Sequence, residues 1–203
     1  MCYHFIMEGF IYIICREGKW KFMNEEDLFP PLTIESLVEM VRRFSDSKSE
    51  IYHMGAVVNY FFKMNPPAQS SDIALIESEC EVNLPCEYKS FLTLVNGLQF
   101  GNAECEICSV ESVIDYYYAF GDFYPPNMLV IATAAGASIH ILLQINEDGY
   151  KLYATSAIGD DYIWLLSDDN LLSFFDKFIS TYGFPFWKMY KDESTAVIKL
   201  NVD

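Results

Sequence analysis

Residues 84–97, LPCEYKSFLTLVNG, constrain the fold of this chain more than any other part of its sequence. Bulky apolar side chains recur there at i, i+3, i+4 and i+7, the spacing of one buried helix face: Tyr88, Phe91, Leu92 and Val95. Pro85 suits the first turn of a helix, because its missing N–H would have no partner there. Gly97 can adopt the left-handed conformation that ends a helix. The stretch therefore predicts a helix facing a core, and its polar residues form no catalytic set.

The segments around this helix alternate between helical and extended patterns. Helices are predicted from Ser71 or Asp72 to Cys80, over 110–120, and from Asp168 or Asp169 to Gly183. The core face of the last helix is predicted to carry Leu172, Phe175, Ile179 and Tyr182. Strands are predicted over 103–110, 128–135, 138–145, 150–156 and 162–167, joined by turns such as NEDG at 146–149. This order indicates an α+β fold, with an antiparallel meander sheet covered by helices.

Two proline pairs interrupt regular secondary structure in the N-terminal third of the chain. They lie in FPPLT at 29–33 and in NPPAQSSD at 65–72, and the second is where we place a domain boundary. Between them we predict two helices. One carries Ile34, Leu37, Val41 and Phe44 on one face, and the other, over 51–64, is apolar nearly all round and should pack against the main domain.

Residues 2–15 form an apolar stretch that is too short for a membrane span and lacks the basic start of a secretion signal. They are expected to form a strand, or to precede a true start at Met23. We therefore predict a helical N-terminal extension over 1–68, a main domain over 69–183, and a tail or edge strand over 184–203.

The negative charge of the chain is concentrated in its middle. The formal net charge is −16, and residues 72–183 hold 17 Asp and Glu against 3 Lys and Arg. Such a field repels nucleic acids and anionic membranes, whose binding depends on cationic side chains. The negative charge favours a basic protein partner. The alternative is that the acidic residues only keep the protein soluble.

The cysteines and histidines do not complete the pattern of a metal or catalytic site. Cys105 and Cys108 have a metal or redox spacing, but no second pair has the spacing that zinc needs, and they fall in a predicted strand. Free thiols in a reducing cytosol are therefore expected for Cys2, Cys15, Cys80, Cys86, Cys105 and Cys108. Among the histidines His4, His53 and His140, the last is predicted to be structural. No cofactor and no metal is predicted.

The run DYYYAFGDFYPP at 115–126 contains more aromatic side chains than one short helix can turn toward a core. Some of them are expected to be exposed beside Asp115 and Asp122, as in a contact surface for a cationic partner. The alternative is that the N-terminal helices cover them. Asp160 and Asp161 are paired carboxylates, but they lie in a predicted turn, where acidic residues are common.

The chain resembles the SUKH superfamily, the Smi/Knr-type domains, over about residues 70–183. The hallmark is an Ile/Leu-x-x-Glu helix end, a short turn, Leu-Pro, a Tyr, Phe-Leu and Asn-Gly. The matching residues here are Ile76, Glu79, Leu84, Pro85, Tyr88, Phe91, Leu92, Asn96 and Gly97. Further similarity lies in CSVESV at 108–113, MLVIATAAGAS at 128–138, YATS at 153–156 and the closing helix at 173–178.

The resemblance implies a cytoplasmic, non-enzymatic binding domain, monomeric or dimeric. Bacterial relatives are mostly regarded as immunity proteins that block a polymorphic toxin, and fungal relatives act as cell-wall regulators and scaffolds. We therefore expect this chain to neutralise a basic toxin domain, with a regulatory scaffold that binds a cellular partner as the alternative and an enzyme as a third. The expected contact residues are Glu104, Glu106, Asp115, Tyr117, Asp122, Asp160 and Asp161.

Overall fold

The computed structural model describes residues 4–7, 10–14, 20–23, 32–45, 49–53, 56–101, 104–156, 162–166, 170–185 and 197–199. The chain divides into two compact units, Met1–Thr33 and Ile34–Asp203. The first unit contains an antiparallel sheet of β1 (His4–Met7), β2 (Phe10–Ile14) and β3 (Trp20–Met23), in that order.

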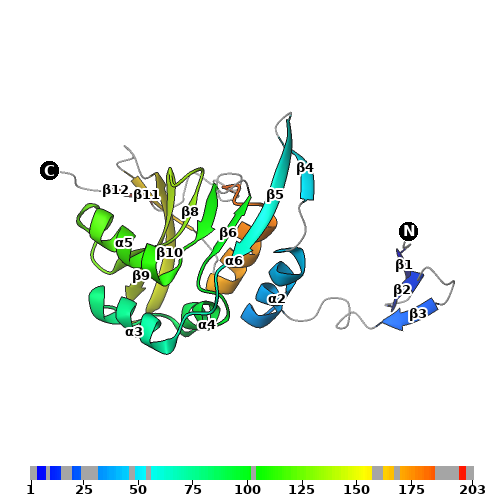
Figure 1. Cartoon of the computed structure of the whole chain (residues 1–203), viewed down its shortest axis with the longest axis horizontal. Helices are drawn as coiled ribbons and strands as arrows, with labels where there is room; N and C mark the ends of the chain where they lie inside the picture. Colours follow the sequence, from blue (N-terminus) through cyan, green and yellow to red (C-terminus); the bar gives the residue numbers. More distant parts are fainter. Residues whose placement is uncertain are drawn as a thin grey trace. The chain divides into compact units, whose positions relative to one another are not determined.

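The second unit is built on one nine-stranded sheet, in which the strands lie side by side in the order of the sequence (Figure 1). These strands are β4 (Ser49–His53), β5 (Ala56–Met64), β6 (Leu98–Gly101), β7 (Cys105–Ile107), β8 (Met128–Ala134), β9 (Ile139–Asn146), β10 (Gly149–Ser156), β11 (Tyr162–Leu165) and β12 (Val197–Lys199). Every neighbouring pair is antiparallel. The predicted α+β meander is therefore confirmed.

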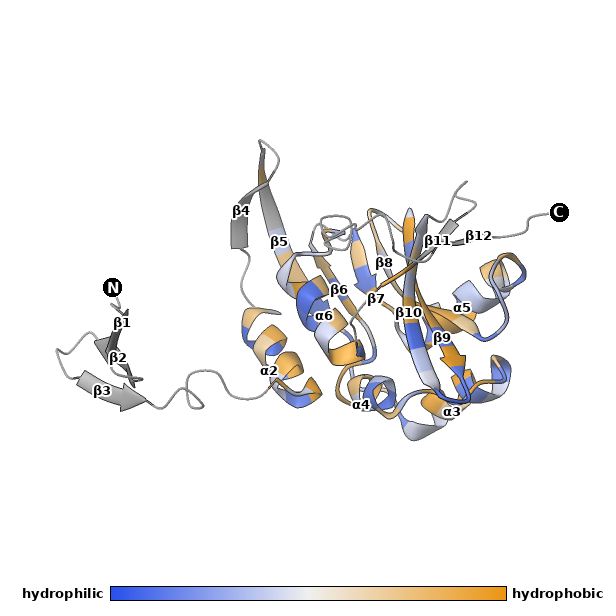
Figure 2. Cartoon of the chain, turned by 180° about the vertical axis from the view of Figure 1, so that it is seen from behind, coloured by the Kyte–Doolittle hydropathy of each residue, from blue (hydrophilic) through white to orange (hydrophobic). Residues whose placement is uncertain are grey.

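One helix precedes this meander, and the others fill its longer connections. They are α2 (Ile34–Ser45), α3 (Ser70–Glu79), α4 (Cys86–Leu94), α5 (Val110–Phe120) and α6 (Leu171–Ser180), with the short 3₁₀ turn η1 (Gly121–Phe123) after α5. All seven residues of β8 are buried, so both faces of the sheet are covered at its centre. Figure 2 shows that hydrophobic residues predominate along β9 and that α6 has hydrophobic and hydrophilic sides.

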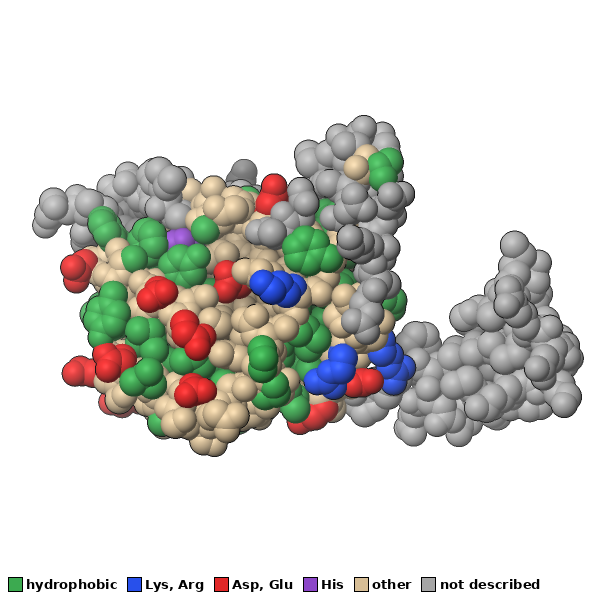
Figure 3. Space-filling model, in the orientation of Figure 1, with side chains coloured by type: hydrophobic (Ala, Val, Ile, Leu, Met, Phe, Trp, Pro, Cys, Tyr) green, Lys and Arg blue, Asp and Glu red, His purple; other side chains and the backbone are tan. Residues whose placement is uncertain are grey.

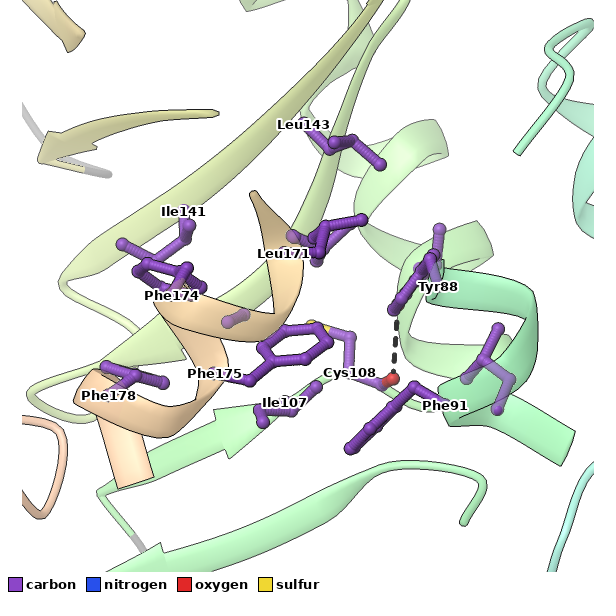
Figure 4. Packing of buried hydrophobic residues seen from close by; sticks show 14 of the residues in the cluster. Tyr88, Phe91, Ile107, Cys108, Ile141, Leu143, Leu171, Phe174, Phe175 and Phe178 are labelled. Carbon is purple, nitrogen blue, oxygen red and sulfur yellow. Dashed lines mark hydrogen bonds between the residues drawn. The ribbon is translucent and has the colours of Figure 1, made fainter. Parts of the chain in front are cut away.

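The apolar stripe at 84–97 lies in the core, as the spacing predicts. Tyr88, Phe91, Leu92 and Val95 are all buried. The ring of Phe91 lies 4.8 Å from that of Phe175 in α6, and the Tyr88 hydroxyl donates to the Cys108 carbonyl at 3.4 Å (Figure 4). Helix α4 thus connects α6 to the start of α5 through side chains that have no access to solvent.

The Asn-Gly pair that follows α4 is a structural junction. The Asn96 side chain accepts the backbone N–H of Val110 at 2.8 Å, at the first residue of α5, and donates to the Glu111 carboxylate at 3.3 Å. Gly97 has a φ of +87°, and a Cβ there would lie 2.7 Å from the backbone nitrogen of Ser109. Only glycine fits this approach, and therefore this part of the hallmark places α5 rather than contacting a ligand.

The second predicted N-terminal helix, over 51–64, is wrong. The chain forms the antiparallel strands β4 and β5 instead, with Ser49 opposite Tyr60 and His53 opposite Ala56. The run AVVNYFF at 56–62 is rich in β-branched and aromatic residues, which favour strands, and β6 offers an edge for it to pair with. A short apolar run is compatible with the residue spacing of a helix and with that of a strand. Here, pairing with the sheet favours the strand.

Helix α2 forms where predicted, but its buried face is shifted. Ile34, Leu37 and Val41 are buried, whereas Phe44 is 53% exposed. Val38 is buried in addition.

The predicted starts of two helices also move, by one to three residues. Gln69 caps α3, and Asp72 accepts the Gln69 N–H at 2.9 Å from within the first turn. Asn170 caps α6 in place of Asp168 or Asp169, with its side chain accepting the Ser173 N–H at 2.8 Å. The buried face of α6 is Leu171, Phe174, Phe175, Phe178 and Ile179, so that Leu172 and Tyr182 are half-buried.

The segment between β5 and α3, where we predict a domain boundary, runs along the end of α4. Backbone N–H groups of Asn65 and Ala68 donate to the carbonyls of Gly97 and Leu92, at 3.2 and 2.9 Å. Because β5 also pairs with β6, β4 and β5 share a sheet with the following domain, and α2 belongs to the same compact unit. At the other end of the sheet, β12 is the edge strand beside β11.

Candidate functional site

The structure describes five of the seven sequence-predicted contact residues, which lie on or beside β7, α5 and η1. Glu104 is exposed just before β7, Asp115 is exposed on α5, and Asp122 is exposed on η1. Glu106 is half-buried in β7, where it accepts the Ser112 hydroxyl at 2.8 Å. Tyr117 is half-buried, with its ring 5.7 Å from that of Tyr118. Asp160 and Asp161 lie outside the described residues.

Helices α3 and α5 lie side by side, and a hydrogen bond from the Tyr118 hydroxyl to the Glu79 carboxylate joins them. Together with η1 they carry a surface of exposed residues that we call the α3–α5 surface: Leu75, Glu79, Glu111, Asp115, Tyr118, Asp122 and Phe123. Tyr118 is 66% exposed and Phe123 is 63% exposed. Large aromatic groups thus reach solvent between carboxylates.

No Lys or Arg occurs in α3, α5 or η1. Figure 3 shows acidic and hydrophobic side chains intermingled over α3 and α5, whereas the basic side chains on this face lie elsewhere, for example over α2. The bond to Glu79 raises the pKa of Tyr118, because ionising this tyrosine beside a carboxylate is unfavourable. The charged side chains of the α3–α5 surface are therefore all carboxylates, and neutral aromatic rings lie among them.

The start of α5 is held by several hydrogen bonds. Ser109 is its N-cap, and its hydroxyl accepts the Ser112 N–H at 3.2 Å. Asn96 accepts the Val110 N–H, and Glu106 accepts the Ser112 hydroxyl. The helix is consequently fixed to α4 and β7, and the acids along it are presented from a rigid support.

The other end of α5 is anchored by a cluster around His140 of β9. This histidine is 1% exposed, and its ring lies 4.9 to 6.1 Å from those of Tyr116, Phe120 and Tyr124. Its Nδ1 is 2.6 Å from the Tyr124 hydroxyl. Burial lowers the pKa of His140 to about 4 and raises that of Tyr124 to about 12, so both are neutral near pH 7. His140 is structural, as predicted.

This cluster explains how the aromatic run at 115–126 is divided. Tyr116, Phe120 and Tyr124 are half-buried around His140, whereas Tyr118 and Phe123 point away from it to solvent. The half-buried rings therefore pack around His140 of the sheet, whereas the alternative prediction was that the N-terminal helices cover them.

The described residues contain no group of three or more His, Cys, Asp or Glu placed to hold a metal ion. Their four cysteines, Cys80, Cys86, Cys105 and Cys108, are free thiols, and burial raises the pKa of Cys80 to about 11. In the same part of the chain, no helix has the length and apolarity to cross a bilayer.

Sequence reasoning missed five members of the α3–α5 surface, because it named Tyr117 rather than Tyr118 and did not name Leu75, Glu79, Glu111 or Phe123. Leu75 and Glu79 lie on a helix that is some 40 positions away from Tyr118 in the sequence, and only tertiary packing brings them together. Phe123 and Glu111 flank the predicted candidates, and a helical projection of 110–120 could have found Glu111 beside Asp115.

Comparison with known proteins identifies the domain that carries this surface. The model of the SMI1 / KNR4 family (SUKH-1) matches residues 67–181. The chain is also similar to the uncharacterized protein YnaB of Bacillus subtilis (strain 168), with 28% identity over 130 residues. That alignment covers 63% of this chain and 88% of YnaB. The α3–α5 surface lies wholly within the matched range.

Proposed function

This chain belongs to the SMI1 / KNR4 family (SUKH-1), and from that premise we propose that it is a non-catalytic protein-binding domain that neutralises a cognate polymorphic toxin. The observation that supports this proposal best is the α3–α5 surface. Its exposed side chains are acidic, apolar or aromatic, and no cation lies on the helices or the turn that form it.

The aromatic groups of this surface supply the anchor for a partner. Tyrosine and other large rings dominate the binding energy of protein interfaces, because each buries a large area at a small cost in side-chain entropy. Tyr118 and Phe123 project from a helix and a turn that the His140 cluster holds in place. A rigid platform of this kind loses little conformational entropy on binding.

The carboxylates select the partner. A toxin that acts on nucleic acid has a basic surface around its active site, because it must bind phosphates. Asp115 and Asp122 lie on the same helix and turn as the exposed rings and Tyr117 lies beside them on α5, whereas Glu106 lies in β7 and Glu104 just before it. We expect these residues, with Asp160 and Asp161, to cover the toxin's basic surface and so to exclude its substrate.

The test is protection against a toxin encoded beside the gene for this chain. The double variant Asp115→Lys, Asp122→Lys reverses two exposed charges on the surface, and we expect it to lose growth protection and to bind the toxin at least about 100-fold more weakly. Glu147→Lys, Asp148→Lys is the matched control, because it reverses two exposed acids in the turn between β9 and β10.

Circular dichroism and the urea midpoint must show that both variants are folded. Full protection by a folded Asp115→Lys, Asp122→Lys variant would contradict the proposal. Equal loss in the control variant would contradict it too, since net charge rather than this surface would then be responsible.

The alternative is a regulatory scaffold of the Smi/Knr type with a cellular partner. The observation that favours it is the separate compact unit Met1–Thr33, which precedes the family domain and supplies a second region for contacts. Affinity purification that recovers one stoichiometric partner unrelated to any neighbouring gene, through the α3–α5 surface or through this unit, would support the scaffold over the immunity protein.

A further inference from the structure

A pocket of about 320 Å³ lies between α2, β5 and α6, away from the α3–α5 surface. We call it the α2–α6 pocket, and its lining residues are Met40, Val41, Phe44, Tyr60, Phe62, Asp176, Ile179, Ser180 and Tyr182. The first five precede residue 67, where the family match begins, and the last four come from α6 and the turn after it. The elements that precede the family domain therefore build one wall of this pocket.

The walls of the pocket are mostly apolar and aromatic. The rings of Tyr60 and Tyr182 lie 4.5 Å apart, and Phe62 lies 6.5 Å from the Tyr182 ring. Sites for small organic ligands typically have volumes of about 300–1,000 Å³, and the volume of this pocket lies near the lower end of that range. The pocket is thus of the size and polarity to take one bulky apolar group.

Among the lining residues that the structure describes, Asp176 carries a charge. It is half-buried on α6, and within the described residues no Lys, Arg or His nitrogen lies within 4.0 Å of its carboxylate. A half-buried carboxylate beside an apolar pocket attracts a cation more strongly than a fully solvated one does, because less water screens it. Aromatic faces next to it add to this preference through cation–π attraction.

We propose that the α2–α6 pocket binds a small molecule in which a bulky apolar group carries a positively charged amine. The apolar group fills the space between Phe62, Tyr182 and Ile179, and the ammonium donates to the Asp176 carboxylate. A single pocket of this volume suits a compact ligand better than an extended peptide, which requires a long groove or a strand edge with a row of backbone partners.

Tryptamine is the probe, because it joins an indole ring to a primary ammonium by a two-carbon chain. Isothermal titration of the full chain should show one site per chain for tryptamine. Indole-3-propionate, with a carboxylate in place of the amine, should bind at least about 10-fold more weakly. The variant Asp176→Asn should weaken tryptamine binding by about 10-fold, which is about 1.4 kcal/mol, and should remove the preference between the two ligands.

Two further variants separate the pocket from general attraction to an acidic protein. Asp148→Asn removes one exposed carboxylate outside the pocket and should leave tryptamine binding unchanged. Ser180→Trp places an indole at the exposed rim of the pocket and should abolish binding while the far-ultraviolet circular dichroism stays the same.

Equal binding of tryptamine and indole-3-propionate, or equal losses in Asp176→Asn and Asp148→Asn, would overturn the proposal. So would binding of the peptide acetyl-Trp-Lys-amide with no binding of tryptamine, since the pocket would then receive a protein segment. None of these outcomes depends on a toxin, and the proposed function is therefore tested separately.

Discussion

Helices α4 and α5 follow one another in the sequence and differ in what their side chains do. Helix α4 turns Tyr88, Phe91 and Leu92 into the core, where none of them is more than 1% exposed. Helix α5 buries Val110 and Val113 at its start and presents Asp115 and Tyr118 to solvent farther along. The first helix carries most of the buried residues of the family hallmark, and the second carries part of the surface that we propose contacts the partner.

The comparison shows that a recognisable motif and a functional surface need not be the same residues. Most hallmark residues form the buried stripe of α4 and the junction at Asn96 and Gly97, which sets the position of α5, whereas the hallmark residue Glu79 at the end of α3 belongs to the α3–α5 surface. The exposed half of α5 has no core to satisfy, and so its residues are free to match a partner. Four experiments test this difference between the buried residues of α4 and the exposed residues of α5. They follow in order of their expected effect on the free energy of unfolding.

Phe91→Ala should have the largest effect. The phenylalanine is 1% exposed and contacts Phe175, so truncation leaves a cavity between α4 and α6. We expect a loss of about 4 kcal/mol, measured by urea denaturation. A loss below about 1 kcal/mol would mean that α4 is not the core helix described here.

Acidification should weaken the cluster beneath α5. The folded-state pKa of His140 is about 4, below its ordinary value of 6.5, so the unfolded chain binds more protons between these values. The stabilisation is complete above pH 6.5 and is lost as the pH falls toward 4, by roughly 3 kcal/mol.

Urea denaturation at several pH values measures this dependence, and His140→Phe is its control. That variant keeps an aromatic ring at the site but cannot be protonated. The wild-type chain should lose about 3 kcal/mol more than the variant between pH 7 and pH 4. Parallel curves for the two proteins would show that His140 does not cause the pH dependence.

Asn96→Ala tests the junction between the two helices. It removes the acceptor for the Val110 N–H and the donor to Glu111. We expect a loss of about 2 kcal/mol in unfolding free energy, because a partly buried backbone N–H is left without its partner. Asn83→Ala is the matched control, since Asn83 is exposed and bonds only the exposed end of Lys89; its effect should stay below about 0.5 kcal/mol.

Tyr118→Ala should have the smallest effect on stability and a large effect on binding. The side chain is 66% exposed, and its bond to Glu79 lies at the surface. The unfolding free energy should change by about 0.5 kcal/mol or less, while affinity for the partner falls at least about 10-fold. A variant that loses more than about 2 kcal/mol of stability would show that Tyr118 belongs to the core.

Much of the fold could be predicted from local patterns. The stripe at Tyr88, Phe91, Leu92 and Val95 predicts α4, and the alternation of apolar segments with short turns predicts the meander from β8 to β11. The sequence predicts a helix in place of strand β5, because its apolar run is compatible with the residue spacing of a helix and with that of a strand. Its true state depends on β6, which lies more than 30 residues later in the sequence.

The candidate site was predictable only in part. Asp115 and Asp122 stand beside an excess of aromatic residues, and that excess alone indicates that some rings are exposed. Which rings are exposed depends on His140, because its buried ring holds Tyr116, Phe120 and Tyr124 on the inside. The α2–α6 pocket left no pattern in the sequence, since its walls come from three separate elements.

The amino-acid sequence by itself determined the acidic character of the middle segment, the core helix α4 and the glycine turn that ends it. These follow from residue type and from spacing within a single turn or helix, which are local properties. Only the tertiary structure decided that Glu79 meets Tyr118 and that Asp176 borders an apolar pocket. Such pairs join residues that are far apart in the chain. No interaction between sequence neighbours brings them together, so they form only when the sheet and its helices assemble.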